Sequence, residues 1–233
     1  MNEFPLIISV DDHVVEPPHV WQTWLPTAFR DRAPRVERQR GTLRFGRRRP
    51  YFDQSDDGAW ADIWMFEGRG MPILSGGASA GSDRSEVQNT PIMFEEVRPG
   101  AYQQAARLAD MDTNHTEASI NFPTFPRFCG QTFLECADRD LGLACVQAYN
   151  DWMIQEWCAG EGYGRLLPMT LVPLWDAELA AAEVRRCAAL GNTSIAFSES
   201  PPALDLPSIH SGWWDPLWAA CDETGTVVNC HIG

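Results

Sequence analysis

The residues with the clearest chemical potential follow two short apolar runs, one near each end of the chain. Residues 6–10 lead into Asp11 and His13, and residues 226–230 lead directly into His231. Carboxylate oxygen and imidazole nitrogen are ligands of Zn²⁺, and a catalytic ion keeps one coordination position open for water. The two runs therefore predict a catalytic site for a divalent metal ion.

The spacing within the first run indicates which side chains face the ion. Successive side chains of a strand point to opposite faces, so Asp11 and His13 share one face and Asp12 takes the other. In a parallel barrel the carboxyl ends of the strands meet at one rim, where His231 can complete the set. We expect one divalent ion, zinc in the first place, with manganese or iron as alternatives because they accept the same ligands.

Three further residues are candidates for the same site. Glu16 lies one helical turn beyond His13, where it is a further ligand, an orienting carboxylate or a helix cap. Glu199 follows the fourth predicted strand and faces the rim, where it contacts substrate or pairs with an arginine. His210 lies in a proline-rich loop, either as a substrate contact or as a surface histidine.

Strands and helices alternate along the chain, and this order must position those side chains. Strands are predicted at 6–10, 118–122, 166–174, 194–197 and 226–230. Helices are predicted at 101–114, 177–190 and from Asp215 to Gly225, and one or two helices within 134–158. Asp176 is the expected N-cap of the helix at 177–190. This alternation is typical of a parallel sheet covered by helices. A doubly wound sheet usually has a glycine-rich turn after its first strand, but Asp11, Asp12 and His13 stand there.

We therefore predict an α/β fold, namely a partial TIM-type (β/α)8 barrel with about five of the eight strand-helix units. Residues 1–233 are expected to form a single barrel domain that is incomplete at its C-terminal side. Residues 30–100 are an irregular insertion or lid after the first strand, with short strands at 35–45 and 59–66. In an incomplete barrel, the first and fifth strands would have unpaired edges and exposed apolar faces.

The composition excludes several kinds of partner and chemistry. The formal net charge of −14 argues against nucleic acid, and the cluster of Arg44 with residues 47–49 is interpreted as a solvated loop. The chain contains no lysine, which excludes a Schiff base, a phosphate-binding loop with its lysine and a carbamylated lysine between two metal ions. No run reaches the roughly 20 apolar residues of a membrane span, so no membrane partner is expected.

The N-terminus and the cysteines indicate the cellular compartment in which the protein is expected. The first residues lack a basic segment and a long apolar core, so we expect no secretory signal. The seven cysteines are scattered, odd in number and without a CxxC pair, which favours reduced thiols. We therefore expect a cytoplasmic protein.

The segment from Asp11 to Pro17 resembles the opening motif of the amidohydrolase-related family, also called amidohydrolase 2. This branch of the amidohydrolase superfamily includes aminocarboxymuconate-semialdehyde decarboxylase and γ-resorcylate decarboxylase. The resemblance covers nearly the whole chain apart from the stretch at about 30–100. It continues through residues 149–152, 165–168, 173–174, 180–183, Arg186, 214–218 and 231–233.

The resemblance implies a site with one metal ion at the carboxyl ends of the strands. Strand one would supply Asp11 and His13, and strand five would supply His231. An aspartate of strand eight would normally complete the set, and this chain looks like the N-terminal part only. Because relatives are commonly dimeric or larger, a homo-oligomer is a further expectation.

The function that the resemblance implies is that of a metal-dependent hydrolase with a single barrel domain over residues 1–233. Metal-activated water would cleave a C–N or C–O bond of a small organic substrate. One alternative is a non-oxidative decarboxylase of a small aromatic or unsaturated carboxylic acid, which shares the metal ligands. The other alternative is an inactive, truncated remnant of such an enzyme.

Overall fold

A parallel sheet whose strands follow one another in chain order forms the centre of the protein. The computed structural model describes residues 4–45, 50–83, 85 and 87–232. β1 (Ile7–His13) pairs with β6 (Thr116–Phe122), β6 with β7 (Leu166–Pro168), and β8 (Ser194–Ser198) with β9 (Val227–His231). All these pairings are parallel, and a parallel bridge from Thr170 to Ile195 joins the two groups. This is the strand order of a parallel barrel that stays open among the described residues, as predicted.

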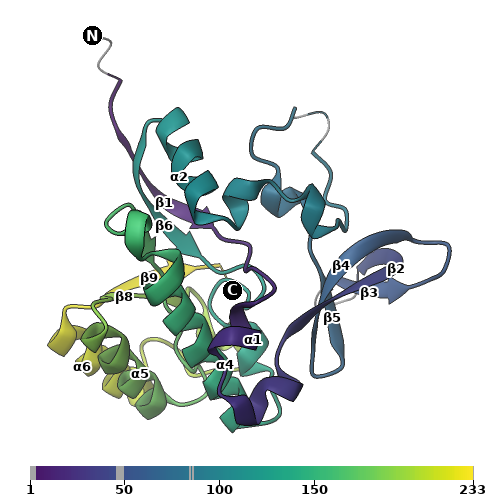
Figure 1. Cartoon of the computed structure of the whole chain (residues 1–233). Coiled ribbons are helices and arrows are strands. Elements are labelled where there is room, and N and C mark those ends of the chain that lie inside the picture. The colour runs from purple at the N-terminus through teal and green to yellow at the C-terminus, as the bar shows by residue number, and fades with distance from the viewer. Residues whose placement is uncertain (1–3, 46–49, 84, 86, 233) are drawn as a thin grey trace.

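Helices follow the strands as the sequence pattern predicts. They are α1 (Val20–Trp24), α2 (Gln104–Thr113), α3 (Gln131–Leu134), α4 (Arg139–Trp152), α5 (Ala177–Ala189) and α6 (Asp215–Thr224). The Asp176 carboxylate caps α5 by accepting from the N–H groups of Glu178 and Leu179 at 2.9 and 3.0 Å. α6 ends at Gly225, whose φ of 67° lies in the left-handed region that glycine adopts easily. In Figure 1, α5 and α6 lie side by side next to β8 and β9.

The third strand is shorter than predicted, because backbone pairing gives way to a side chain. The prediction ran over 166–174, whereas β7 ends at Pro168, which has no N–H to donate. Further on, Asn150 of α4 takes the place of a neighbouring strand. Its Nδ2 donates to the Leu171 carbonyl at 2.9 Å, and the Leu171 N–H donates to its Oδ1 at 2.7 Å.

Two predicted helices begin later than expected. Residues Pro99–Ala101 form a 3₁₀ turn, so α2 begins only at Gln104. The segment 134–158 is divided at Asp138, whose carboxylate accepts from the N–H groups of Asp140 and Leu141 and so starts α4. α4 then continues into a π-helical turn at Met153–Trp157.

The insertion after β1 forms a small antiparallel sheet of its own. It contains β2 (Arg35–Phe45), β3 (Pro50–Gln54), β4 (Ala59–Phe66) and β5 (Arg69–Pro72) in the order β3-β2-β4-β5. Figure 1 shows this sheet standing beside the helices, away from β8 and β9. Of the predicted basic cluster, Arg44 pairs with Asp53 at 3.3 Å, and residues 47–49 lie outside the described residues.

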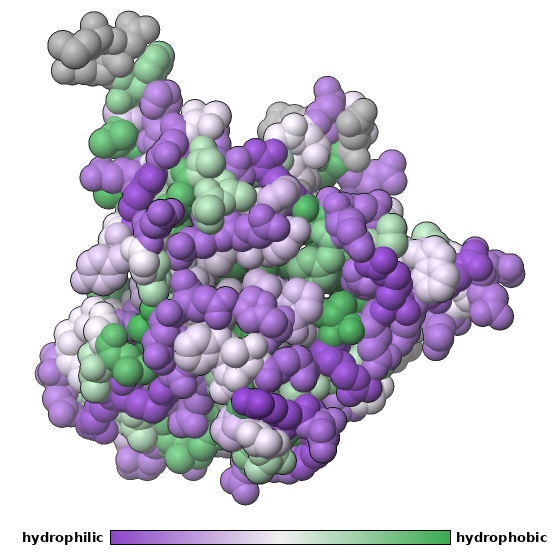
Figure 2. Space-filling view, viewed as in Figure 1, coloured by the Kyte–Doolittle hydropathy of each residue, from purple (hydrophilic) through white to green (hydrophobic). Residues whose placement is uncertain are grey.

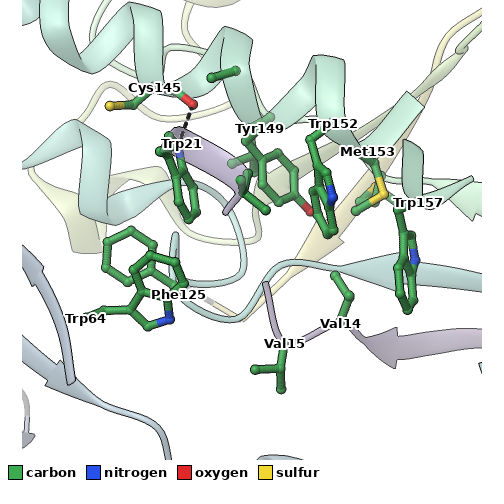
Figure 3. Packing of buried hydrophobic residues seen from close by; sticks show 14 of the residues in the cluster. Val14, Val15, Trp21, Trp64, Phe125, Cys145, Tyr149, Trp152, Met153 and Trp157 are labelled. Atoms are coloured by element: carbon green, nitrogen blue, oxygen red, sulfur yellow. Dashed lines mark hydrogen bonds between the residues drawn. The ribbon is translucent and has the colours of Figure 1, made fainter. Parts of the chain in front are cut away.

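Aromatic packing attaches the insertion to the barrel part (Figure 3). The buried ring of Trp21 in α1 lies 5.2 Å from the ring of Trp64 in β4 and 5.1 Å from that of Phe125. Its indole N–H donates to the Cys145 carbonyl of α4 at 3.1 Å. Because Phe125 follows β6, this cluster fixes the insertion over the carboxyl end of that strand.

The outer strands of the parallel sheet are open, as the prediction of an incomplete barrel requires. Among the described residues, β1 pairs only with β6 and β9 only with β8. Ile8 and Val10 of β1 are 61% and 65% exposed, and Val227 of β9 is 59% exposed. In Figure 2 apolar surface accordingly follows the projecting N-terminal arm.

Two other expectations can be compared with the structure. No helix in the described ranges has the length and apolar character to cross a membrane. All seven cysteines are free thiols, and only Cys230 is exposed.

Candidate metal centre

Asp11, His13 and His231 come together where β1 and β9 end. The Asp11 Oδ1 lies 3.1 Å from the His231 Nε2 and 3.6 Å from the His13 Nε2. The centroids of the two imidazole rings are 5.3 Å apart, and the ring planes are nearly perpendicular. One ligand atom from each residue lies within 4.8 Å of the others. Two nitrogens and one oxygen in this arrangement fit a divalent ion of the zinc, manganese or iron type.

Hydrogen bonds on the far side of each imidazole aim its Nε2 at the shared position. The His13 Nδ1 lies 3.2 Å from the Pro123 carbonyl, and the His231 Nδ1 lies 3.1 Å from the Ile232 carbonyl. A carbonyl only accepts, so a ring that is protonated on Nδ1 keeps the Nε2 lone pair for a metal ion. The His231 Nε2 also faces the Asp11 Oδ1 at 3.1 Å, a contact that requires a proton on Nε2 when no ion lies between them. The Phe128 ring packs against both imidazoles, with centroid distances of 4.6 and 4.5 Å.

Burial also favours the form of His13 that binds metal. Removal of the ring from water lowers the pKa of His13, the hydrogen bond to Pro123 opposes this, and the neighbouring His231 lowers the pKa further. A lowered pKa keeps the imidazole neutral near pH 7, and only a neutral imidazole can ligate a metal ion.

Asp12 and Arg107 fix the end of β1 from the other side. The Asp12 carboxylate accepts from the Ser119 hydroxyl of β6 at 2.5 Å, so Asp12 points away from the Asp11 face, as the alternation predicts. Arg107 of α2 donates to the His13 carbonyl at 2.6 Å and to the Asn121 Oδ1 at 3.3 Å. Burial lowers the pKa of Arg107. These contacts hold the backbone that carries His13.

Glu16 lies outside the group of three candidate ligands. Its side chain is fully buried, and its two carboxylate oxygens accept from the N–H groups of Thr124 and Phe125 at 2.9 and 2.8 Å. Those residues directly follow Pro123, whose carbonyl accepts the His13 hydrogen bond. Glu16 is therefore placed to hold the loop that orients His13.

The burial of Glu16 predicts an unusual pH dependence of stability. Burial raises its pKa from 4.5 to about 7, against the opposing effect of the two backbone hydrogen bonds. Between these values the folded state keeps a proton that the unfolded state has lost, so the free energy of unfolding falls as the pH rises. From pH 4.5 to 7.5, we expect the metal-free protein to lose about 3 kcal/mol relative to Glu16→Gln.

Urea unfolding of both proteins at several pH values measures this difference. Glutamine keeps one acceptor oxygen and does not titrate, so its loss of one hydrogen bond shifts stability equally at every pH. Parallel pH profiles of the two proteins would show that Glu16 has an ordinary pKa.

A cavity of about 1170 Å³ opens beside the candidate metal centre. Asp11 and His13 line it from β1, and Arg98, Arg107 and Arg127 line it from the surrounding segments. Residues 71–74, from β5 and the chain just beyond it, form part of the wall. The insertion thus contributes to a chamber large enough for a small organic molecule.

Glu199 and His210 do not line this cavity. The Glu199 N–H donates to the His231 carbonyl at 3.1 Å, which continues the pairing of β8 with β9, and its side chain is exposed. His210 lies in an exposed turn in which its N–H donates to the Ser208 hydroxyl at 3.3 Å. Substrate contact by either residue stays a prediction.

The sequence pattern did not single out Arg107, Arg127 or Gln131 as site residues. Arg107 lies on a helix with no motif around it. Arg127 lies in the loop that follows β6 and Gln131 is the first residue of α3 after it, and the segments after barrel strands commonly carry functional side chains. That position was the available signal for these two residues.

The parallel strands, the helices that follow them and the candidate ligands at the strand ends agree with the predicted barrel fold. The sequence pattern of the amidohydrolase family matches residues 19–233. The chain therefore belongs to the amidohydrolase family. Among curated proteins, none matches it.

One of the solved structures that are similar to this chain shows the same fold. An amidohydrolase from Mycobacterium avium subsp. paratuberculosis is 22% identical with a TM-score of 0.65; the match covers 98% of this chain and 59% of that one. A manganese-bound 5-carboxyvanillate decarboxylase from Novosphingobium aromaticivorans is 21% identical over 68% of this chain and 43% of that one, with a TM-score of 0.48. A 2,6-dihydroxybenzoate decarboxylase is 14% identical over 98% of this chain and 50% of that one, also at 0.48. The chain thus spans less than two thirds of each of these structures.

Proposed function

We propose that the chain supplies the metal centre of a metal-dependent hydrolase that cleaves a C–N or C–O bond of a small organic substrate. The observation that carries this proposal is the meeting of Asp11, His13 and His231 at the edge of a large cavity. Asp11 and the two imidazoles would hold one divalent ion. When bound, such an ion activates water and polarises the carbonyl group that is attacked.

The residues of the chain itself would position the reacting groups. Pro123 and Ile232 keep the two Nε2 atoms directed at the ion, and Phe128 shields both rings from water. The apolar walls around the cavity would exclude bulk solvent, which strengthens charge interactions inside it. The proposal includes a small-molecule substrate and assembly into a homo-oligomer, without nucleic acid or membrane as partner.

A second candidate function is non-oxidative decarboxylation of a small carboxylic acid. It is favoured by the three arginines that line the cavity, Arg98, Arg107 and Arg127, because a carboxylic acid enters the site as an anion. Arg98 and Arg127 also form ion pairs with Asp110 and Glu135, and the acidic residues Asp11, Asp12, Glu16 and Asp110 line the same cavity. The same ion would then hold the carboxylate of the substrate instead of activating water.

One panel of assays separates these functions. The purified protein, loaded with zinc or manganese, is incubated with esters, lactones and amides on one side and with aromatic carboxylic acids on the other. Product release from the first group that stops after chelation supports the hydrolase. Metal-dependent release of carbon dioxide from the second supports the decarboxylase. A chain that binds no metal and converts neither group contradicts both.

A further inference from the structure

A buried amide donor without a partner lines the same cavity. In the described part of the chain, three buried side-chain polar atoms make no hydrogen bond: the Gln131 Nε2, the Tyr149 hydroxyl and the Trp157 Nε1. Of these residues, only Gln131 lines the cavity beside Asp11 and His13. Buried polar groups are almost always hydrogen-bonded, so a missing partner marks a position where a water molecule or a ligand can supply one.

The amide of Gln131 is held in a defined orientation. Its Oε1 accepts from the Cys129 N–H at 2.9 Å, and only 1% of the residue is exposed. Because a backbone N–H needs an acceptor, this bond also identifies which end of the amide is oxygen. Neither hydrogen of the buried Nε2 has an acceptor among the described residues.

The loop that carries Gln131 contacts the candidate metal centre directly. Phe128 packs on both imidazoles, and the Cys129 thiol donates to the His231 carbonyl at 3.6 Å. Arg127 begins this loop, lines the same cavity and forms an ion pair with Glu135 at 3.3 Å. An amide donor at the start of α3 and a guanidinium cation from the loop before it thus line the same cavity as Asp11 and His13.

We propose that Gln131 and Arg127 form a subsite that binds a carboxylate group of the substrate beside the metal ion. A carboxylate is planar and accepts several hydrogen bonds, which suits an amide donor combined with a guanidinium group. The inference rests on the proposed function, because the subsite gains its catalytic meaning from the neighbouring ion. In this subsite Gln131 makes the protein prefer substrates with a carboxylate group over uncharged analogues.

The test is a calorimetric titration with benzoate, carried out on the zinc-loaded protein and on the metal-free protein. Gln131→Glu keeps an oxygen for the Cys129 N–H and replaces only the free donor by a second acceptor. We expect its dissociation constant for benzoate to be at least about tenfold higher than that of the wild type, because the donor is lost and a negative charge is added. Gln131→Met, which lacks both polar atoms, is expected to bind benzoate weakly as well.

Gln155→Glu is the matched control, because Gln155 is exposed and does not line the cavity. It makes the same change of charge and is expected to bind benzoate as the wild type does. Circular dichroism checks that each variant is folded.

The outcomes separate the subsite from the metal centre. Wild-type benzoate affinity in folded Gln131→Glu and Gln131→Met, or no saturable benzoate binding by the wild type, would overturn the subsite. Absence of zinc together with benzoate binding that depends on residue 131 would overturn the metal function alone.

Discussion

Replacing His13 by alanine is expected to weaken zinc binding at least about 100-fold. Loss of a residue that merely orients a ligand typically costs 10–100-fold in metal affinity, and loss of a ligand costs more. His13 would supply one of only three candidate ligand atoms in the described ranges, so the two that remain, on Asp11 and His231, bind an ion poorly. Metal analysis after dialysis against buffered zinc measures the effect.

His210→Ala is the control for this experiment, because His210 is exposed and lies away from the cavity. It removes one imidazole without touching the candidate centre, so it is expected to keep the zinc content of the wild type. Equal zinc in wild type and His13→Ala would show that the three residues do not form a metal site.

The second large effect is expected from Glu183→Ala, which should lower the free energy of unfolding by about 3–5 kcal/mol. Glu183 of α5 is 2% exposed and receives hydrogen bonds from Arg186 at 2.7 and 2.9 Å and from Asn150 at 2.7 Å. Its removal takes away the buried acceptor that Arg186 and Asn150 share, while Arg186 keeps its ion pair with Asp151 at 2.6 Å. Asn150 also pairs with Leu171, so the damage extends to the sheet.

Chemical denaturation of Glu183→Ala and Glu178→Ala compares a buried with an exposed glutamate of the same helix. Glu178 faces solvent, and its replacement is expected to change stability by no more than about 0.5 kcal/mol. Similar losses in both variants would mean that the buried network contributes no more than an ordinary surface residue.

The sequence predicted the alternation of strands and helices because that pattern depends on neighbouring residues. Asp176 caps α5 through N–H groups two and three positions away, and Gly225 ends α6 by its own backbone freedom. The ends of β1 and β9 follow from the runs that precede them. Together with the barrel topology, these local features indicated that His13 and His231 would face a common rim, which is where the structure places them.

The boundaries of β7 could not be predicted, because they depend on a distant side chain. A run of apolar residues from 166 to 174 is typical of a long strand, and nothing within it announces that Asn150 will bind Leu171. That contact exists only when α4 packs against the sheet.

What the sequence by itself determined is the set of elements and the side chains at their ends: Asp11 and His13 on one face of a strand, and His231 at the end of another. Only the tertiary structure decided which remaining groups join the site. Glu16 bonds to residues 108 and 109 positions away, the insertion forms a wall of the cavity, and Gln131 is left with a free donor. The physical reason is that the partner of a buried polar group depends on strand register and helix packing, which bring distant residues together and leave no trace in the local pattern.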